Sequence, residues 1–125
     1  MSPRAAGATQ HELSRIGLLA TLPGETLARL AQRMTREQIA AGAPILEEGE
    51  VGDRFYVVLS GILAVSQQAR GAQSVLRPGD YFGEVALAMR MPRTASVRAL
   101  TPATVASCDL ATFDEFVRPL FADDP

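Results

Sequence analysis

The chain has 125 residues, 47% of them hydrophobic, with 14 acidic and 12 basic side chains and a formal net charge of −2. These values predict one globular domain with a single core and argue against nonspecific nucleic-acid binding. The only cysteine, Cys108, and the only histidine, His11, exclude a disulfide framework, a multi-cysteine zinc site and the histidine cluster of a metal-dependent barrel enzyme, so we expect no metal and no catalytic residue.

The two ends of the chain are predicted to lie outside the folded part. Residues 1–9 predict a flexible leader and residues 123–125 a frayed end, with a single domain over residues 10–122. No apolar run approaches the roughly 18 residues of a membrane span. The N-terminus also lacks the apolar core of a secretion signal. We therefore expect a cytoplasmic protein with no membrane span in this chain.

The first third of the chain has helical spacing. Two apolar stripes follow one another, before and after Pro23, where a new helix can begin. They are formed by Leu13, Ile16 and Ala20, then by Leu27, Leu30, Ala31 and Met34. Two helices are therefore expected ahead of the rest of the domain.

From about residue 36 the pattern changes to short apolar runs separated by glycine and proline. Such runs at close spacing predict an antiparallel sandwich or barrel. The run from Phe55 to Leu59 is apolar throughout, which predicts a strand buried on both faces. The predicted strands are 36–40, 44–48, 54–60, 62–68, 73–77, 94–100 and 103–109.

Two segments interrupt the strands with helical patterns. Residues 84–91 contain good helix formers and no turn residue, which predicts a short helix between strands. Residues 111–121 carry apolar side chains at helical spacing and predict an amphipathic terminal helix packed on the barrel. Pro119 is expected to end or kink this helix early.

The residues around the short helix form the chemically informative pattern. Gly83 leads into the helix, whose first backbone N–H groups have no intrahelical partner and suit an anion. Glu84 lies in the first turn as an acceptor, and Arg93, nine residues later, can fold back over the same cavity. One acceptor, several backbone donors and one guanidinium fit a ligand with one hydroxyl and one phosphate, such as a ribose 3′,5′-cyclic phosphate.

With these residues the sequence resembles the cyclic nucleotide-binding domains of cAMP-dependent kinase regulatory subunits, catabolite activator proteins and cyclic nucleotide-gated channels. The family's phosphate-binding cassette is matched by residues 82–87 (FGEVAL) and 93–95 (RTA). Its upstream pattern is matched by residues 49–53 (GEVGD) and 55–58 (FYVV) and by Gly61. The resemblance covers roughly residues 13–121. It implies a mainly β fold with flanking helices, namely an antiparallel β-roll or jelly-roll barrel with N-terminal helices, a short cassette helix and a C-terminal helix.

The resemblance also implies roles for individual residues. Glu84 would accept a hydrogen bond from the ribose 2′-hydroxyl, and Arg93 would bind the cyclic phosphate. The side chains of Val75 and Leu87 are weaker candidates to line the base. Backbone N–H groups would complete the sugar-phosphate site at Gly83, Ala86, Leu87 and Thr94.

The function implied is a non-catalytic regulatory sensor without a cofactor. Its ligand would be cAMP, with cGMP as the alternative because a threonine at position 94 is linked in the family to cGMP tolerance. Binding would shift the terminal helices and signal to a protein partner or to a parent channel or transporter. Few residues follow Asp109, so we expect no helical lid over the base and no DNA-binding helices in this chain.

Other interpretations of the same residues stay open. A β-roll that has lost its ligand and serves a structural or protein-interaction function is the second hypothesis. Taken alone, Glu84 could be a helix-terminus carboxylate, and Arg93 a surface residue or the salt-bridge partner of Glu84. Thr94 could be an ordinary strand residue, and Tyr81 and Phe82 could belong to the core.

Overall fold

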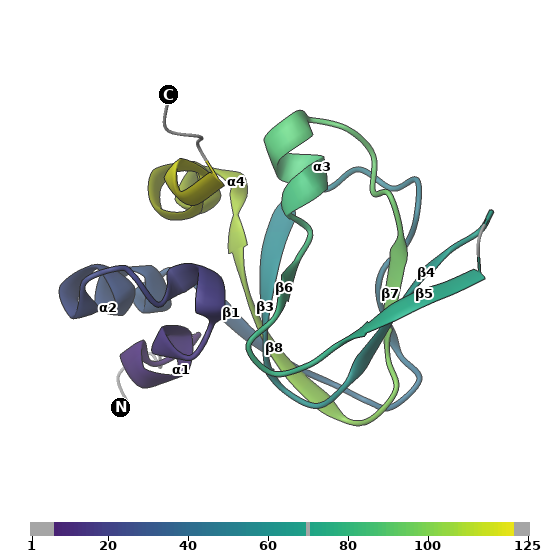
Figure 1. The fold of residues 1–125 in the computed structure, drawn as a ribbon, viewed down its shortest axis with the longest axis horizontal. Helices are drawn as coiled ribbons and strands as arrows, with labels where there is room; N and C mark the ends of the chain where they lie inside the picture. The colour runs from purple at the N-terminus through teal and green to yellow at the C-terminus, as the bar shows by residue number, and fades with distance from the viewer. Residues whose placement is uncertain (1–6, 70, 122–125) are drawn as a thin grey trace, which may run out of the picture.

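Two four-stranded antiparallel sheets face each other in the computed structural model, which describes residues 7–69 and 71–121 (Figure 1). The first sheet has the order β1-β8-β3-β6, with the bounds Thr35–Ile39, Ala103–Asp109, Arg54–Ser60 and Tyr81–Phe82. The second has the order β2-β7-β4-β5, with the bounds Pro44–Leu46, Ser96–Ala99, Leu63–Gln67 and Gly71–Leu76. The predicted antiparallel β-roll is confirmed.

Strand β3 is buried on both faces because it separates two cores. Phe55 and Val57 point to the helices, whereas Tyr56 and Val58 point between the two sheets. All four side chains are at most 8% exposed. An uninterrupted apolar run is what a strand in this position needs, since its alternate side chains face two different apolar layers.

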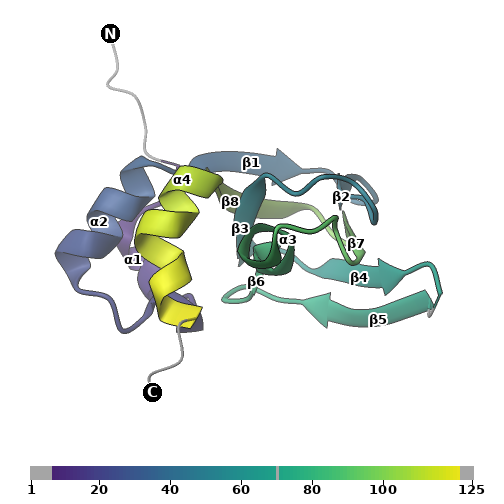
Figure 2. The same ribbon diagram turned by 90° about the horizontal axis from the view of Figure 1, so that it is seen from above.

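The helices from the two ends of the chain form one layer beside the barrel, whereas the short helix at residues 84–89 lies apart from them over the strands (Figure 2). Helix α1 (Gln10–Ser14), the 3₁₀ turn η1 (Gly17–Leu19) and helix α2 (Gly24–Gln32) precede the sheets. The stripe predicted for the second helix is buried throughout, from Leu27 to Met34. The first predicted stripe does not form one helix. Leu13 lies in α1, Ile16 lies between α1 and η1, and Ala20, directly after η1, is exposed.

The C-terminal segment, residues 110–121, completes this layer. It contains α4 (Leu110–Thr112), the π-helical turn η2 (Phe113–Val117) and the 3₁₀ turn η3 (Arg118–Phe121). Pro119 does not end the segment, because the chain leaves the α-helical hydrogen-bond pattern before it reaches Pro119. No helix within residues 7–69 or 71–121 is both long and apolar enough to cross a bilayer.

Part of the predicted flexible leader is packed against the domain. Residues 1–6 lie outside the described residues, as does the predicted frayed end, but Ala8 is 1% exposed within the core beside the helices. The Thr9 hydroxyl accepts a hydrogen bond from the Glu12 N–H at 3.0 Å, and the Glu12 carboxylate accepts one from the Thr9 N–H. This capping box begins α1. The expected leader is therefore wrong for Gly7, Ala8 and Thr9.

Most predicted strands are confirmed with small differences in their ends. The predictions 54–60 and 103–109 coincide with β3 and β8, whereas 94–100 shortens to β7. Strand β6 was missed, because Tyr81–Phe82 offers only two residues between a glycine turn and a helix. It pairs with β3 through Tyr56 and Val57, and its position at the edge of the sheet delivers the chain to the short helix.

Candidate functional site

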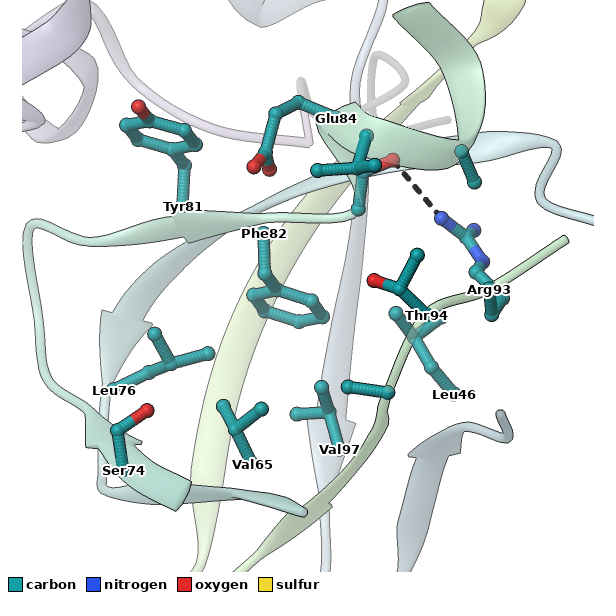
Figure 3. A pocket seen from close by; sticks show the side chains of 14 residues that line it. Leu46, Val65, Ser74, Leu76, Tyr81, Phe82, Glu84, Arg93, Thr94 and Val97 are labelled. Atoms are coloured by element: carbon teal, nitrogen blue, oxygen red, sulfur yellow. Dashed lines mark hydrogen bonds between the residues drawn. The ribbon is translucent and has the colours of Figure 1, made fainter. Parts of the chain in front are cut away.

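A cavity of about 260 Å³ lies between the second sheet and helix α3 (Glu84–Met89), as Figure 3 shows. One end of the cavity is polar, and the other is formed by aliphatic side chains of β2, β4, β5 and β7. Its lining residues are Leu46, Val65, Ser74, Leu76, Tyr81, Phe82, Gly83, Glu84, Val85, Ala86, Arg93, Thr94, Ala95 and Val97.

Gly83 turns the chain from β6 into α3 at the polar end of the cavity. Its φ of +91° lies in the left-handed region that favours glycine. A Cβ at this position would lie 2.9 Å from the Arg54 carbonyl oxygen and 3.0 Å from Arg93 Nη1. Both the backbone angle and the space therefore require glycine. The turn leaves the first N–H groups of α3 without intrahelical partners.

Arg93 is buried, with 6% of its surface exposed, and its guanidinium is bound by two backbone carbonyls. Nη1 donates to the Gly83 carbonyl at 3.0 Å and Nη2 donates to the Arg54 carbonyl at 3.0 Å. Since a guanidinium carries five N–H donors, donors remain for a ligand. The side chain is thus held in one orientation at the polar end of the cavity.

The loop before β3 is built around Arg93. The Arg93 N–H donates to the Glu50 carbonyl and the Gly49 N–H donates to the Arg93 carbonyl, each at 2.8 Å. Gly52 makes room for the guanidinium, because a Cβ there would lie 2.9 Å from Arg93 Cζ and 2.4 Å from the Ala86 Cβ. The upstream glycine pattern therefore positions the arginine as well as shaping a turn.

The charge of Arg93 has no carboxylate partner in the part of the chain that the structure describes. Among the described residues, no carboxylate oxygen lies within salt-bridge distance of it. The alternative predictions for this residue, a surface position or a salt bridge to Glu84, are both wrong. Burial lowers the pKa of the guanidinium from its ordinary value, yet an arginine stays charged in proteins. A buried positive charge bound only by neutral carbonyls favours an anion beside it.

Glu84 supplies the complementary feature. One of its carboxylate oxygens, Oε2, is buried and has no hydrogen-bond partner. Burial raises the pKa of this carboxyl above its ordinary value, and a backbone hydrogen bond and the charge of Arg93 oppose the shift. Figure 3 shows the Glu84 side chain beside Tyr81, away from the Arg93 guanidinium. An acceptor without a donor in a cavity wall is well suited to a ligand hydroxyl.

Thr94 and the aliphatic end complete the cavity. Thr94 is exposed, its side chain borders the cavity, and its carbonyl accepts a hydrogen bond from Gln67 Nε2 at 2.8 Å. The Phe82 ring is stacked on Tyr56 with 4.9 Å between centroids and forms part of the wall. A flat apolar group fits between this ring and the aliphatic side chains of β4 and β7.

Comparison with known proteins identifies the family. Residues 36–119 match the family model described as "Cyclic nucleotide-binding domain". The chain belongs to the cyclic nucleotide-binding domain family. Residues 82–87 and 93–95, for which the sequence predicts a phosphate-binding cassette, lie within the matched segment.

The relatives of this cyclic nucleotide-binding domain include kinase regulatory proteins. It is 36% identical over 107 residues to the regulatory subunit of cAMP-dependent protein kinase from Debaryomyces hansenii, covering 86% of this chain and 24% of that protein. It is 33% identical over 114 residues to the cGMP-dependent protein kinase egl-4 of Caenorhabditis briggsae, covering 86% of this chain and 15% of that protein. The chain thus spans a quarter or less of these relatives.

Solved structures support the same fold. The regulatory domain of Toxoplasma gondii PKA, crystallised with cAMP, superposes with a TM-score of 0.84 at 28% sequence identity. The superposition covers 89% of this chain and 44% of that one. The mainly β fold with flanking helices is therefore shared with a cAMP-bound regulatory domain.

The structure brings five of the seven predicted site residues to the cavity, namely Gly83, Glu84, Ala86, Arg93 and Thr94. The side chains of Val75 and Leu87 do not line it. Val75 points to the other face of β5, because side chains alternate along a strand and its neighbours Ser74 and Leu76 face the cavity. Leu87 is 2% exposed and packs into the core beside the helices.

The apolar end of the cavity could not be predicted from the sequence. Leu46, Val65 and Val97 come from three strands, and only the pairing of the strands shows that they face one space. For Tyr81 and Phe82 the sequence left a core position open, and the structure places both in the cavity lining. Residues 7–69 and 71–121 contain no group of three or more His, Cys, Asp or Glu side chains able to hold a metal ion.

Proposed function

We propose that this domain is a non-catalytic regulatory sensor that binds one cyclic nucleotide in the cavity beside α3. The observation that carries the proposal is the pair of unpaired groups at its polar end. Among residues 7–69 and 71–121, Arg93 is a buried cation without a carboxylate partner, and Glu84 has a buried oxygen without a donor. A ribose 3′,5′-cyclic phosphate has one anionic group and one free hydroxyl, so it satisfies both.

Each polar group has a defined part in binding. Arg93 binds the cyclic phosphate through the N–H groups that Gly83 and Arg54 leave free. Backbone N–H groups of residues 83–87 and of Thr94 complete the phosphate site, and Glu84 accepts from the ribose 2′-hydroxyl. The base occupies the apolar end, between Phe82 and the side chains of Val65 and Val97.

The ligand is cAMP, with cGMP as the alternative. Relatives of both kinds exist, since one is named a cAMP-dependent and another a cGMP-dependent kinase protein. Thr94 borders the cavity. A threonine hydroxyl accepts hydrogen bonds, so it would pair with the amino group that guanine has and adenine lacks at that edge.

Replacement of Thr94 by alanine tests how the base is read. If the hydroxyl bonds guanine, Thr94→Ala weakens cGMP binding about fivefold to tenfold, the value of one neutral hydrogen bond, and leaves cAMP within twofold. Calorimetric titrations of the wild type and of Thr94→Ala with cAMP and with cGMP measure the change in the ratio of the two affinities. Equal losses for the two nucleotides would make Thr94 a phosphate or strand residue and remove it from base selection.

Binding transmits a signal by moving the C-terminal segment. Phe113, Phe116 and Leu120 pack this segment into the core shared with Leu87 of α3, so a displacement of the cassette reaches it directly. The size of the response is limited by the difference in ligand affinity between the two arrangements. The recipient of the signal is a protein partner or a fused effector such as a kinase, channel or transporter.

An NMR titration with cAMP tests both parts of the proposal, namely ligand binding in the cavity and the response of the C-terminal segment. Amide shifts at residues 83–87 and 93–94 are expected if the ligand occupies the cavity, and shifts at residues 110–121 are expected if the segment responds. Shifts confined to the cavity would contradict the signalling half. The absence of any shift with cAMP or cGMP would favour the second hypothesis, a ligand-free interaction domain.

A further inference from the structure

The C-terminal end of the cassette helix α3 depends on a side chain from outside the helix. The Ala86 carbonyl accepts from the backbone N–H groups of Arg90 and Met91, where the chain turns through a left-handed residue, Arg90, with φ of +53°. The next two carbonyls, of Leu87 and Ala88, accept from Arg118 instead. Nη2 bonds the first and Nη1 the second, each at 3.2 Å.

Arg118 is itself fixed within the C-terminal segment. Its Nε donates to Asp114 Oδ1 at 2.7 Å, one helical turn earlier. Its guanidinium lies over the Phe113 ring, with Cζ 5.3 Å from the centroid, and Phe113 is fully buried. The Asp114 carboxylate binds the guanidinium at its Nε edge and the Phe113 ring covers one of its faces. The remaining N–H groups therefore point in a fixed direction. Those groups meet the two open carbonyls of α3.

This contact joins the two elements that the proposed function requires to move together. Gly83 and Glu84 lie at the N-terminal end of α3, and the Gly83 carbonyl accepts a hydrogen bond from Arg93. A contact that fixes the last turn of this short helix therefore also fixes the positions of Gly83 and Glu84 relative to Arg93. Within the described residues, Arg118 makes the side-chain hydrogen bonds that link α3 to the C-terminal segment, residues 110–121. The other side-chain bonds of that segment do not reach α3. Apolar packing of Leu87 and Phe113 in one core accompanies them but fixes no direction.

We propose that Arg118 is a positioning residue for the cassette, holding α3 at its C-terminal end and coupling cavity occupancy to the C-terminal segment. The coupling half rests on the proposed function. The positioning half concerns the ligand-free protein and can be tested without any nucleotide.

The test compares Arg118→Met with a matched control, Arg33→Met. Arg33 binds the same segment from the opposite side, through a 2.6 Å ion pair with Glu115 and a position 5.4 Å from the Phe116 ring centroid. Each substitution therefore removes one arginine, one ion pair and one aromatic contact, but only Arg118→Met frees the carbonyls of α3. Arg118→Lys keeps the positive charge but lacks the planar guanidinium with its several N–H donors. It replaces Arg118→Met in the test if the methionine variant does not fold.

Hydrogen exchange of the ligand-free proteins is measured first. Arg118→Met is expected to speed exchange of the α3 amides at least threefold, Arg118→Lys by less, and Arg33→Met not at all. Unchanged α3 exchange in the Arg118 variants would overturn the positioning role whether or not the domain binds a nucleotide.

Titration with cAMP then tests the coupling. Loss of Arg118 is expected to weaken binding about tenfold, within the usual range of coupling between sites, and Arg33→Met is expected to stay within twofold. Saturating cAMP should protect amides of residues 113–121 in the wild type and in Arg33→Met but not in Arg118→Met. Equal protection in all three would overturn the coupling. A wild type that binds neither cAMP nor cGMP would instead overturn the proposed function, a result distinct from either failure.

Discussion

Replacement of Arg93 by methionine is expected to weaken cyclic-nucleotide binding at least 100-fold. The substitution keeps the apolar stem and removes every guanidinium donor to the phosphate, while the backbone N–H donors remain. Two charge-assisted bonds, each worth roughly 1.5–3 kcal/mol, account for this loss. Since the Gly83 and Arg54 carbonyls also lose their donor, the ligand-free protein should lose about 1–3 kcal/mol of unfolding free energy. Calorimetric titration measures the first effect and thermal unfolding the second.

Two controls show whether the phosphate is the group affected. Adenosine has the base and the ribose but no phosphate, so its weak binding should change little in Arg93→Met. Arg98→Met changes an exposed arginine of β7 that does not line the cavity, and should bind cAMP as the wild type does. A parallel loss for adenosine and cAMP would mean that the cavity collapses, and unaltered cAMP binding would remove Arg93 from the site.

Replacement of Glu84 by glutamine is expected to act in opposite directions on binding and on stability. Affinity for cAMP should fall about tenfold, because a neutral amide accepts a weaker bond from the 2′-hydroxyl than a carboxylate does. The ligand-free protein should gain stability, on the order of 1 kcal/mol, because a buried charged oxygen without a partner is removed. Titration and thermal unfolding provide the two values.

A 2′-deoxy analogue of cAMP isolates the hydroxyl. It should bind the wild type more weakly than cAMP does, whereas Glu84→Gln should discriminate less between the two ligands. Glu47→Gln alters an exposed carboxylate outside the cavity and should leave both affinities unchanged. Equal wild-type affinity for cAMP and its 2′-deoxy analogue would contradict the assigned contact.

The same carboxyl group predicts a pH dependence. Burial raises the pKa of Glu84 in the folded protein, so the group stabilises the fold at pH values below its unfolded pKa and this contribution is lost as pH rises through the raised pKa. The affinity for the nucleotide should have the opposite pH dependence. It should fall as pH drops through the raised pKa, because protonation of the Glu84 carboxylate weakens it as an acceptor for the 2′-hydroxyl. Titrations across this window in wild type and Glu84→Gln measure the effect, and only the wild type should show it.

The sequence was sufficient for the fold and for the polar end of the cavity, for reasons visible in particular residues. The unbroken apolar run of β3 marked a strand between two cores. Gly83, Glu84 and Arg93 were found because a left-handed turn, a first-turn carboxylate and a returning arginine are all local in the chain.

Features that depend on strand pairing or side-chain direction could not be read in this way. Val75 was placed on the wrong face of β5, since a shift of one residue reverses every side chain and the sequence does not fix the register. The absence of a Glu84–Arg93 ion pair follows from where the Gly83 and Arg54 carbonyls lie. The Arg118 contact joins segments thirty residues apart, for which no local pattern exists.

Isothermal titration of the nucleotide-stripped chain with cAMP, and then with cGMP, tests the central claim most directly. We expect saturable binding of one cyclic nucleotide per chain, lost in Arg93→Met and retained in Arg98→Met. The ratio of the two affinities then identifies the preferred base. No heat and no thermal stabilisation with either nucleotide would contradict a cyclic-nucleotide sensor and leave an interaction domain built on the same β-roll.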